Sequence, residues 1–278
     1  MTIDEIIDSA LKEDIGNGDH TSLSTIPASA QGKARLLIKE EGIICGIDVA
    51  VKVLAKVDPS IVFNRMLKDG DYVKSGDIAF TIEGPSVSIL TAERLVLNFM
   101  QRMSGIATTT NDYVQQLKGT RTRLLDTRKT TPLLREIEKY AVKTGGGENH
   151  RFGLFDMILI KDNHIDFAGG ITGAVNAVKS YLKSKNLNLK IEVEARTLDD
   201  VKEILGCGNV HRIMLDNFTP DRIKEAVALI DGLVETEASG GITIENLREY
   251  AETGVDFISV GALTHHIKSL DMSLKAFF

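Results

Sequence analysis

The spacing of apolar residues changes along the chain and separates it into distinct stretches. Over residues 1–15 the apolar positions lie three or four apart, which predicts an amphipathic helix. From Gly32 to Pro85, short apolar runs separated by polar turns predict strands, with one helical run among them. The proline-free segment 88–119 is rich in helix formers and predicts one or two helices. The first hundred residues therefore predict a small α+β domain followed by helix.

After Gly119, six apolar runs alternate with amphipathic stretches of about 10 to 15 residues, which predicts strands separated by helices. The six runs are RLLDT, MILIKD, KIEVEA, RIMLDN, LVETEAS and FISVGA. Apolar strands that alternate with helices form parallel sheets whose faces the helices cover. We therefore predict an α/β chain whose C-terminal part is a closed or nearly closed β/α barrel. We also expect a Gly-rich helical region between the first two of these strands.

The composition excludes several classes of protein. Apolar residues make up 43% of the 278 residues, charged residues make up 26%, and the formal net charge is −6. An acidic chain lacks the basic face that nucleic-acid binding normally requires, and its apolar runs fall short of the roughly 18 residues that span a bilayer. The acidic, amphipathic N-terminus is unlike a signal peptide. We expect a cytoplasmic protein that binds neither nucleic acid nor membranes, with Cys45 and Cys207 as small buried side chains.

Polar residues or glycines follow all six predicted strands. In a β/α barrel the C-terminal ends of the strands meet at one mouth, where active sites are built. A single polar residue after a strand is ordinary loop composition, but residues from six strands converge on one place. These residues include Arg128, Lys129, Lys161, Glu194, Asp216, Ser239, Gly240 and Gly261. Cations bind phosphate and carboxylate, and glycines let a phosphate approach the backbone, so we predict a pocket for a phosphate-bearing, multiply anionic substrate.

Two acidic residues, Glu194 and Asp216, end successive predicted strands. Their carboxylates can share a divalent ion or stabilise positive charge that develops on a sugar ring. The alternative is a buried salt bridge from these acids to Lys161 or Arg128. Both alternatives place the acids beside the cations of the predicted pocket.

The segment Thr144–Arg151 contains three successive glycines followed by Glu148, Asn149, His150 and Arg151. Three glycines in a row cost backbone entropy unless a close approach or a positive φ requires them. The segment has no GKS or GKT and does not fit GxGxxG after a strand, so a Walker loop and a dinucleotide fingerprint are excluded. We predict that it delivers His150 and Arg151 to the pocket.

These motifs together resemble those of the quinolinate phosphoribosyltransferase family, also called nicotinate-nucleotide pyrophosphorylase (carboxylating). The matching runs occur in order over roughly residues 90–265, and DTRKTTP with GGGxNHR is far more specific than a single glycine motif. The runs are NFMQRMSGIAT, LLDTRKTTP, EKYAVKTGGGENHR, ILIKDNH, EVEA, IMLDN, ASGGI and SVGALTH. The resemblance implies an open-faced α+β sandwich over residues 1–104, joined by 268–278, and a TIM-like β/α barrel over 105–267.

The resemblance also implies a reaction and a set of residue roles. The substrates are quinolinate and 5-phosphoribosyl-1-pyrophosphate, the cofactor is Mg²⁺, and the products are nicotinate mononucleotide, pyrophosphate and carbon dioxide. A homodimer is implied, in which Arg102 reaches the quinolinate of the neighbouring subunit. Within one chain the resemblance assigns Arg128, Lys129, His150, Arg151 and Lys161 to the cationic pocket, Glu194 and Asp216 to metal, ribose and catalysis with Lys161, and Ser239, Gly240 and Gly261 to the 5′-phosphate.

One position departs from the family pattern, and two other functions compete with the one implied. The family has glycine after TTP, whereas this chain has Leu133, which is expected to alter the loop that places Lys129. The first competing function is that of a paralogue with the same fold that acts on another pyridine carboxylate. The second is a non-catalytic scaffold or a carrier domain, which KDGDYVKSGD resembles. The cations and paired acids at successive strand ends argue against the second.

Overall fold

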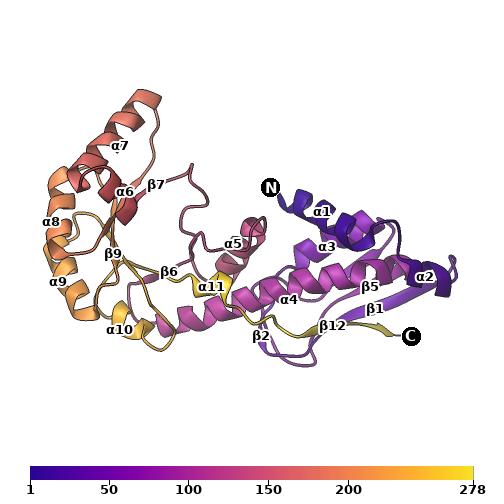
Figure 1. The fold of residues 1–278 in the computed structure, drawn as a ribbon. Helices are drawn as coiled ribbons and strands as arrows, with labels where there is room; N and C mark the ends of the chain where they lie inside the picture. The colour runs from indigo at the N-terminus through magenta and orange to yellow at the C-terminus, as the bar shows by residue number, and fades with distance from the viewer. Residues whose placement is uncertain (278) are drawn as a thin grey trace. The chain divides into compact units, whose positions relative to one another are not determined.

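The computed structural model describes residues 1–277, which form two compact units. The first unit comprises Met1–Asp112, Thr130–Gly146 and the segment from Leu263 onward, and the second comprises Tyr113–Lys129 and Gly147–Ala262 (Figure 1). The units therefore interleave along the sequence. Within residues 1–277 no helix is both long enough and apolar enough to cross a bilayer.

The first unit is built on a four-stranded antiparallel sheet in the order β12-β1-β5-β3. In β1 the side chains of Ala34, Leu36 and Ile38 are buried, and the residues between them are more exposed. This alternation is that of a sheet with one covered face. In Figure 1 the sequence-distant strands β1 and β12 run side by side. The strands are β1 Gln31–Ile38, β3 Val62–Arg65, β5 Ile78–Pro85 and β12 Met272–Phe277, with a separate pair β2 Gly42–Ile43 and β4 Tyr72–Val73.

The helices of the first unit follow the predicted apolar spacing. The prediction for residues 1–15 is confirmed by α1, which begins at a capping box formed by Thr2 and Glu5. The prediction for 88–119 is confirmed by one long helix, α4, whose last residues belong to the second unit. The helices are α1 Ile3–Ile15, α2 His20–Thr25, α3 Ile47–Val57, α4 Ser86–Gln116, α5 Arg135–Thr144 and, ending in this unit, α11 Ala262–His265.

The glycine run after α5 meets both of the requirements that justify glycine. A Cβ atom on Gly145 would lie 2.3 Å from the carbonyl oxygen of Ala107 on α4, so only glycine permits this packing. Gly146 has φ +96°, in the region that other residues rarely adopt. The expected helical region contains α5, which ends at Thr144 directly before the glycines.

The second unit is a parallel six-stranded sheet in the order β6-β11-β10-β9-β8-β7. The strands follow the chain order from β7 to β11, and β6 joins beside β11, so the sheet curls into a barrel that is open between β6 and β7. At the free edge of β6, Glu148 forms an isolated parallel bridge with Leu125. All six predicted strands are confirmed: β6 Arg123–Leu125, β7 Ile158–Ile160, β8 Ile191–Ala195, β9 Arg212–Asp216, β10 Glu235–Ser239 and β11 Phe257–Ser259.

Helices follow the strands of the second unit and cover the outer face of its sheet. In Figure 1 the helices α7, α8 and α9 succeed one another along this face, and neighbouring helices contact each other. The short helix α6 begins directly after Lys161. Cys207, expected to be buried, ends α8 and is partly exposed. The helices are α6 Asp162–Phe167, α7 Ile171–Lys185, α8 Leu198–Cys207, α9 Pro220–Ile230 and α10 Leu247–Ala251.

Candidate active site

The C-terminal edge of the parallel sheet gathers the residues predicted from the strand ends. Asp216 and Ser239 are the last residues of β9 and β10 and lie opposite each other in the sheet register. Glu194 is the penultimate residue of β8, and Lys161 directly follows β7. Arg128 and Lys129 follow β6, and Gly261 follows β11. The sequence prediction of one mouth built by six strands is therefore consistent with the position of these residues in the second unit.

Cations of this mouth lie close enough to influence one another. Burial lowers the pKa of Arg151, and the nearby charge of Arg128 lowers it further. The guanidinium of Arg151 donates to the carbonyl oxygen of Met157 at 3.4 Å. Like charges repel at short range, so a site that holds two guanidinium groups together is adapted to an anionic ligand.

The acids Glu194 and Asp216 face Lys161. The Nζ atom of Lys161 lies 4.0 Å from Oε2 of Glu194, whose side chain is 6% exposed. Burial raises the pKa of Glu194, the charge of Asp216 raises it further, and Lys161 opposes both effects. Burial also raises the pKa of Asp216, against the opposing effect of Lys161. Two mutually repelling carboxylates beside the ammonium groups of Lys161 and Lys129 provide hard oxygen ligands, which fit Mg²⁺.

Gly240 occupies a position that excludes any larger residue. It has φ +94°, and a Cβ atom there would lie 2.2 Å from Oδ1 of Asn217. Asn217 also has a positive φ and donates from Nδ2 to Oδ2 of Asp216 at 2.6 Å. The glycine after β10 therefore lets the loop after β9 approach closely and hold Asp216.

Arg102 belongs to the first unit, where a buried carboxylate holds its guanidinium. Its Nε and Nη2 atoms donate to Oε1 of Glu138 at 3.0 and 2.6 Å, and Nη2 donates to Oγ1 of Thr131 at 2.7 Å. Glu138 is fully buried, and its Oε2 accepts the backbone N–H of Thr131. Glu138 therefore links Arg102 on α4 to the TTP loop.

The inner face of the barrel carries a buried charged cluster that the sequence prediction missed. Glu192 and Glu237 are fully buried, and Nη1 of Arg212 lies 3.0 Å from Oε2 of Glu237. His150 extends toward them, with Nε2 3.1 Å from Oε2 of Glu192 and 3.4 Å from Oε2 of Glu237. Burial and the neighbouring Glu237 raise the pKa of Glu192 to about 7. The signal in the sequence was the alternation of acids in IEVEA and ETEAS, which places Glu192 and Glu237 on one face of the sheet.

Leu133 adopts the backbone conformation that glycine would favour. Its φ is +69°, and its side chain is 69% exposed. A residue with a Cβ atom pays about 1–2 kcal/mol for this conformation, whereas glycine does not. We expect Leu133→Gly to raise the free energy of unfolding by roughly 0.5 to 1 kcal/mol, the difference between relieved strain and added chain entropy. Chemical denaturation measures this change.

A matched control for this substitution is Asn186→Gly. Asn186 ends α7 with φ +51°, and asparagine tolerates this region better than leucine does. The control is therefore expected to stabilise the protein less than Leu133→Gly. Equal effects of the two substitutions would contradict a specific strain at Leu133.

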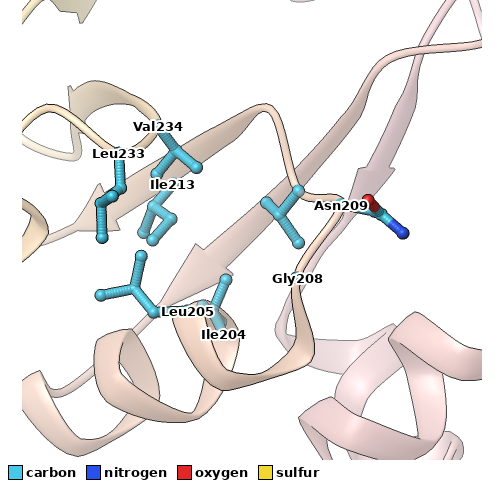
Figure 2. Close-up of a pocket in the computed structure, with 8 residues that line it drawn as sticks. Ile204, Leu205, Gly208, Asn209, Ile213, Leu233 and Val234 are labelled. Carbon is cyan, nitrogen blue, oxygen red and sulfur yellow. The ribbon is translucent and has the colours of Figure 1, made fainter.

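The pocket drawn in Figure 2 lies at the opposite end of the barrel strands from Lys161, Glu194 and Asp216. It has a volume of about 240 Å³ and is lined by apolar side chains of α8, β9 and the segment before β10. Ile213 lies near the start of β9, whereas Asp216 lies at its end. In β/α barrels this N-terminal end contributes to stability and the C-terminal end holds the chemistry.

The fold and the site define an enzyme with a β/α barrel and a cationic, anion-binding mouth. Comparison with known proteins identifies its family. The family described as "Quinolinate phosphoribosyl transferase, N-terminal domain" matches residues 19–104, and "Quinolinate phosphoribosyl transferase, C-terminal domain" matches residues 106–275. The chain belongs to the quinolinate phosphoribosyltransferase family.

Individual relatives are similar over nearly the whole chain. A curated Arabidopsis thaliana protein, named nicotinate-nucleotide pyrophosphorylase (carboxylating), chloroplastic, is 48% identical over 97% of this chain and 81% of its own. The solved structure of NadC from Streptococcus pyogenes is 40% identical, with a TM-score of 0.94 over 98% of this chain and 95% of that one. The nicotinate-nucleotide pyrophosphorylase from Francisella tularensis is 42% identical, with a TM-score of 0.93 over 99% and 96%. These similarities confirm the predicted family and fold class.

Proposed function

We propose that this protein transfers the phosphoribosyl group of 5-phosphoribosyl-1-pyrophosphate to quinolinate and removes one carboxyl group. The products are nicotinate mononucleotide, pyrophosphate and carbon dioxide, in the de novo synthesis of NAD. The observation that carries the proposal is the set of cations and paired acids at one end of the barrel, in a chain that belongs to this family. Arg128, Arg151 and Lys161 provide positive charge for a dicarboxylate and for phosphate groups.

The transfer step forms a bond between the quinolinate nitrogen and the anomeric carbon and breaks the bond to pyrophosphate. Positive charge develops on the ribose ring while negative charge leaves with pyrophosphate. Lys161 and Lys129 neutralise the leaving group, and the carboxylates of Glu194 and Asp216 stabilise the ring. Burial of Glu194 strengthens this interaction because water screens it less.

Decarboxylation follows transfer in the proposed order. Ribosylation places a positive charge on the pyridine nitrogen, which stabilises the electron pair left on the adjacent ring carbon when carbon dioxide departs. That carbon then takes up a proton. The protein has only to hold the carboxylates, and the guanidinium groups of Arg128 and Arg151 are suited to do so.

We include Mg²⁺ in the proposal because Glu194 and Asp216 fit it. Both carboxylates lie at the mouth, and burial raises the pKa of each, so a cation would relieve an unfavourable arrangement of charge. When bound, the ion would supply positive charge to the pyrophosphate. We also propose a cytoplasmic location, although the Arabidopsis relative is described as chloroplastic.

A homodimer completes the proposed site, with Arg102 of one subunit serving the quinolinate of the other. Two facts support this arrangement. The chain belongs to the family, and Glu138 and Thr131 hold the guanidinium of Arg102 in a fixed orientation. A fixed guanidinium loses little entropy when it binds a carboxylate.

Substrate discrimination tests the proposed function. We expect quinolinate to be used with a kcat/KM at least about 100-fold above that for nicotinate, because nicotinate leaves one desolvated cation without its carboxylate. The measurement is product analysis by chromatography with the sugar donor, Mg²⁺ and either acid. Equal catalytic efficiency for both acids would contradict the proposed role of the cations. Turnover of a different pyridine carboxylate alone would favour a paralogous enzyme.

A further inference from the structure

The guanidinium of Arg102 makes its hydrogen bonds through one edge. Nε and Nη2 donate to Oε1 of Glu138 at 3.0 and 2.6 Å, and Nη2 also donates to Oγ1 of Thr131 at 2.7 Å and to the carbonyl oxygen of Thr264 at 3.4 Å. Within residues 1–277 no hydrogen bond of Arg102 uses Nη1, and 29% of the side chain is exposed. The edge that carries Nη1 is therefore the part of Arg102 that remains for a ligand.

The carboxyl group of Glu138 uses a different oxygen for each of its two neighbours. Oε1 accepts from Arg102 on α4, whereas Oε2 accepts the backbone N–H of Thr131 in the TTP loop at 3.2 Å. Glu138 is fully buried, so water does not replace either contact. A carboxylate accepts at both oxygens, whereas a glutamine side chain has one acceptor oxygen and an NH2 group that only donates. Glutamate therefore satisfies both neighbours at this position, and glutamine would lose one of them.

The two helices that carry this pair are held close together. Arg102 lies on α4 and Glu138 lies on α5. A Cβ atom on Gly145, directly after α5, would lie 2.3 Å from the carbonyl oxygen of Ala107 on α4, so the two backbones are in direct contact there. An arginine that is held in this way loses less conformational freedom on binding a ligand than one that rotates freely. The direction in which Nη1 faces is therefore set by Glu138.

The alternative is that Glu138 only stabilises the fold as the buried partner of Arg102. The strongest form of such a pair is the fork, in which two guanidinium nitrogens bond to two carboxylate oxygens. Here both nitrogens share Oε1, and Oε2 bonds to the backbone of Thr131. A purely structural pair also gives no reason for the Nη1 edge to be left without a hydrogen bond within residues 1–277. The arrangement is that of a guanidinium prepared for a ligand.

We propose that Glu138 is a positioning residue for quinolinate, which holds the Nε and Nη2 edge of Arg102 so that a carboxylate of the substrate binds through Nη1. This proposal rests on the proposed function, in which Arg102 binds quinolinate. Thr131 completes the arrangement, because its hydroxyl accepts from Nη2 and its backbone N–H donates to Glu138. Glu138 acts through Arg102 and does not contact the substrate.

A double-mutant cycle between Glu138 and Arg102 tests the proposal. We expect Glu138→Gln to raise the KM for quinolinate by roughly 5- to 20-fold, because the guanidinium must then be ordered on binding. The kcat and the KM for the sugar donor should change by less than about 2-fold, as for a loss of substrate binding alone. In an Arg102→Lys background the same substitution is expected to raise the KM for quinolinate by less than about 2-fold. Equal factors in the two backgrounds, or an equal rise in the KM for the sugar donor, would overturn the proposal.

The matched control is Glu136→Gln. Glu136 lies on α5 two residues before Glu138 and is partly exposed, and the substitution removes the same charge. Within residues 1–277 it is not among the hydrogen-bond partners of Arg102. This variant is expected to leave both KM values and kcat unchanged. A rise in the KM for quinolinate equal to that of Glu138→Gln would show that any lost charge on α5 has this effect, and would overturn the assignment.

Thr131→Val gives a second test that leaves the buried carboxylate in place. It removes the hydroxyl that accepts from Nη2 of Arg102 and keeps the backbone N–H that donates to Glu138. We expect the KM for quinolinate to rise by roughly 2- to 5-fold, with kcat unchanged. If Glu138→Gln does not fold, this variant decides the proposal, and an unchanged KM for quinolinate overturns it.

Calorimetric binding of quinolinate to the full-length protein separates this proposal from the proposed function. We expect the wild-type protein to bind quinolinate roughly 5- to 20-fold more tightly than Glu138→Gln does. If the wild-type protein does not turn quinolinate over but shows this difference in affinity, the proposed function fails alone. Equal affinities of the two proteins, or no binding to either, would overturn the role of Glu138.

Discussion

Lys161→Ala is expected to lower kcat/KM for quinolinate by about 1000-fold, because removal of one preorganised charge from an active site costs on the order of 100- to 1000-fold. The Nζ atom of Lys161 lies 4.0 Å from Oε2 of Glu194, and its charge opposes the rise that burial causes in the pKa of Asp216, so it acts on both acids of the site. Half of the lysine side chain is exposed, so the free energy of unfolding should change by less than about 0.5 kcal/mol. Steady-state kinetics and chemical denaturation on the same samples measure the two effects.

The control for this prediction is Lys202→Ala. Lys202 is an exposed lysine on α8 that pairs with the exposed Asp199 at 2.8 Å. It should leave both activity and stability unchanged. If Lys161→Ala destabilised the protein while the folded fraction kept its specific activity, Lys161 would have a structural role.

The architecture of the barrel was predictable because each strand and helix carries its own local signal. Runs such as RIMLD and FIS are apolar on the side that packs against helices, and the intervening helices have clear amphipathic spacing. The rule that strand ends meet at one edge then placed Lys161, Glu194 and Asp216 together without any knowledge of distances. Periodicity and one topological rule were sufficient for this part of the site.

The buried cluster of Glu192, Arg212 and Glu237 was not predictable by the same method. Apolar spacing identifies a strand but does not show that charged side chains within it face the interior of the barrel. Glu192 lies two residues before Glu194, and Glu237 lies two residues before Ser239. Only the register of β8, β9 and β10 shows that Arg212 lies between the two acids. Their charges are tolerated because His150 lies beside both carboxylates and Arg212 pairs with Glu237 inside the barrel. Register is a tertiary property, and a single sequence does not specify it.

The loop at Leu133 shows a different limit. A leucine in place of the family's glycine is expected to change the loop, and Leu133 has a φ of +69°, which leucine rarely adopts. The surrounding contacts, including the bond from Thr131 to Glu138, hold the backbone against the preference of the side chain. The backbone preference of leucine therefore predicts that position 133 is strained, but it does not predict the φ that the loop adopts there.

Mixing two impaired variants, Arg102→Lys and Lys161→Ala, is expected to restore about a quarter of wild-type activity if Arg102 serves the neighbouring subunit in a symmetric dimer. After random exchange half of the dimers are mixed, and each mixed dimer holds one site with both defects and one intact site. Lysine at position 102 keeps a cation beside the fully buried Glu138, which protects the fold, but it lacks the planar fork that binds a carboxylate. Activity is measured after exchange in mild denaturant.

The matched control mixes Arg128→Ala with Lys161→Ala. Both residues lie in the second unit, and under the proposal both serve the site of their own chain, so every site in every dimer keeps at least one defect. No activity should return. If the Arg102→Lys and Lys161→Ala mixture also stayed inactive, although size-exclusion and mass analysis showed mixed dimers, Arg102 would serve its own chain. The recovered fraction therefore reports directly whether one subunit completes the other's quinolinate site.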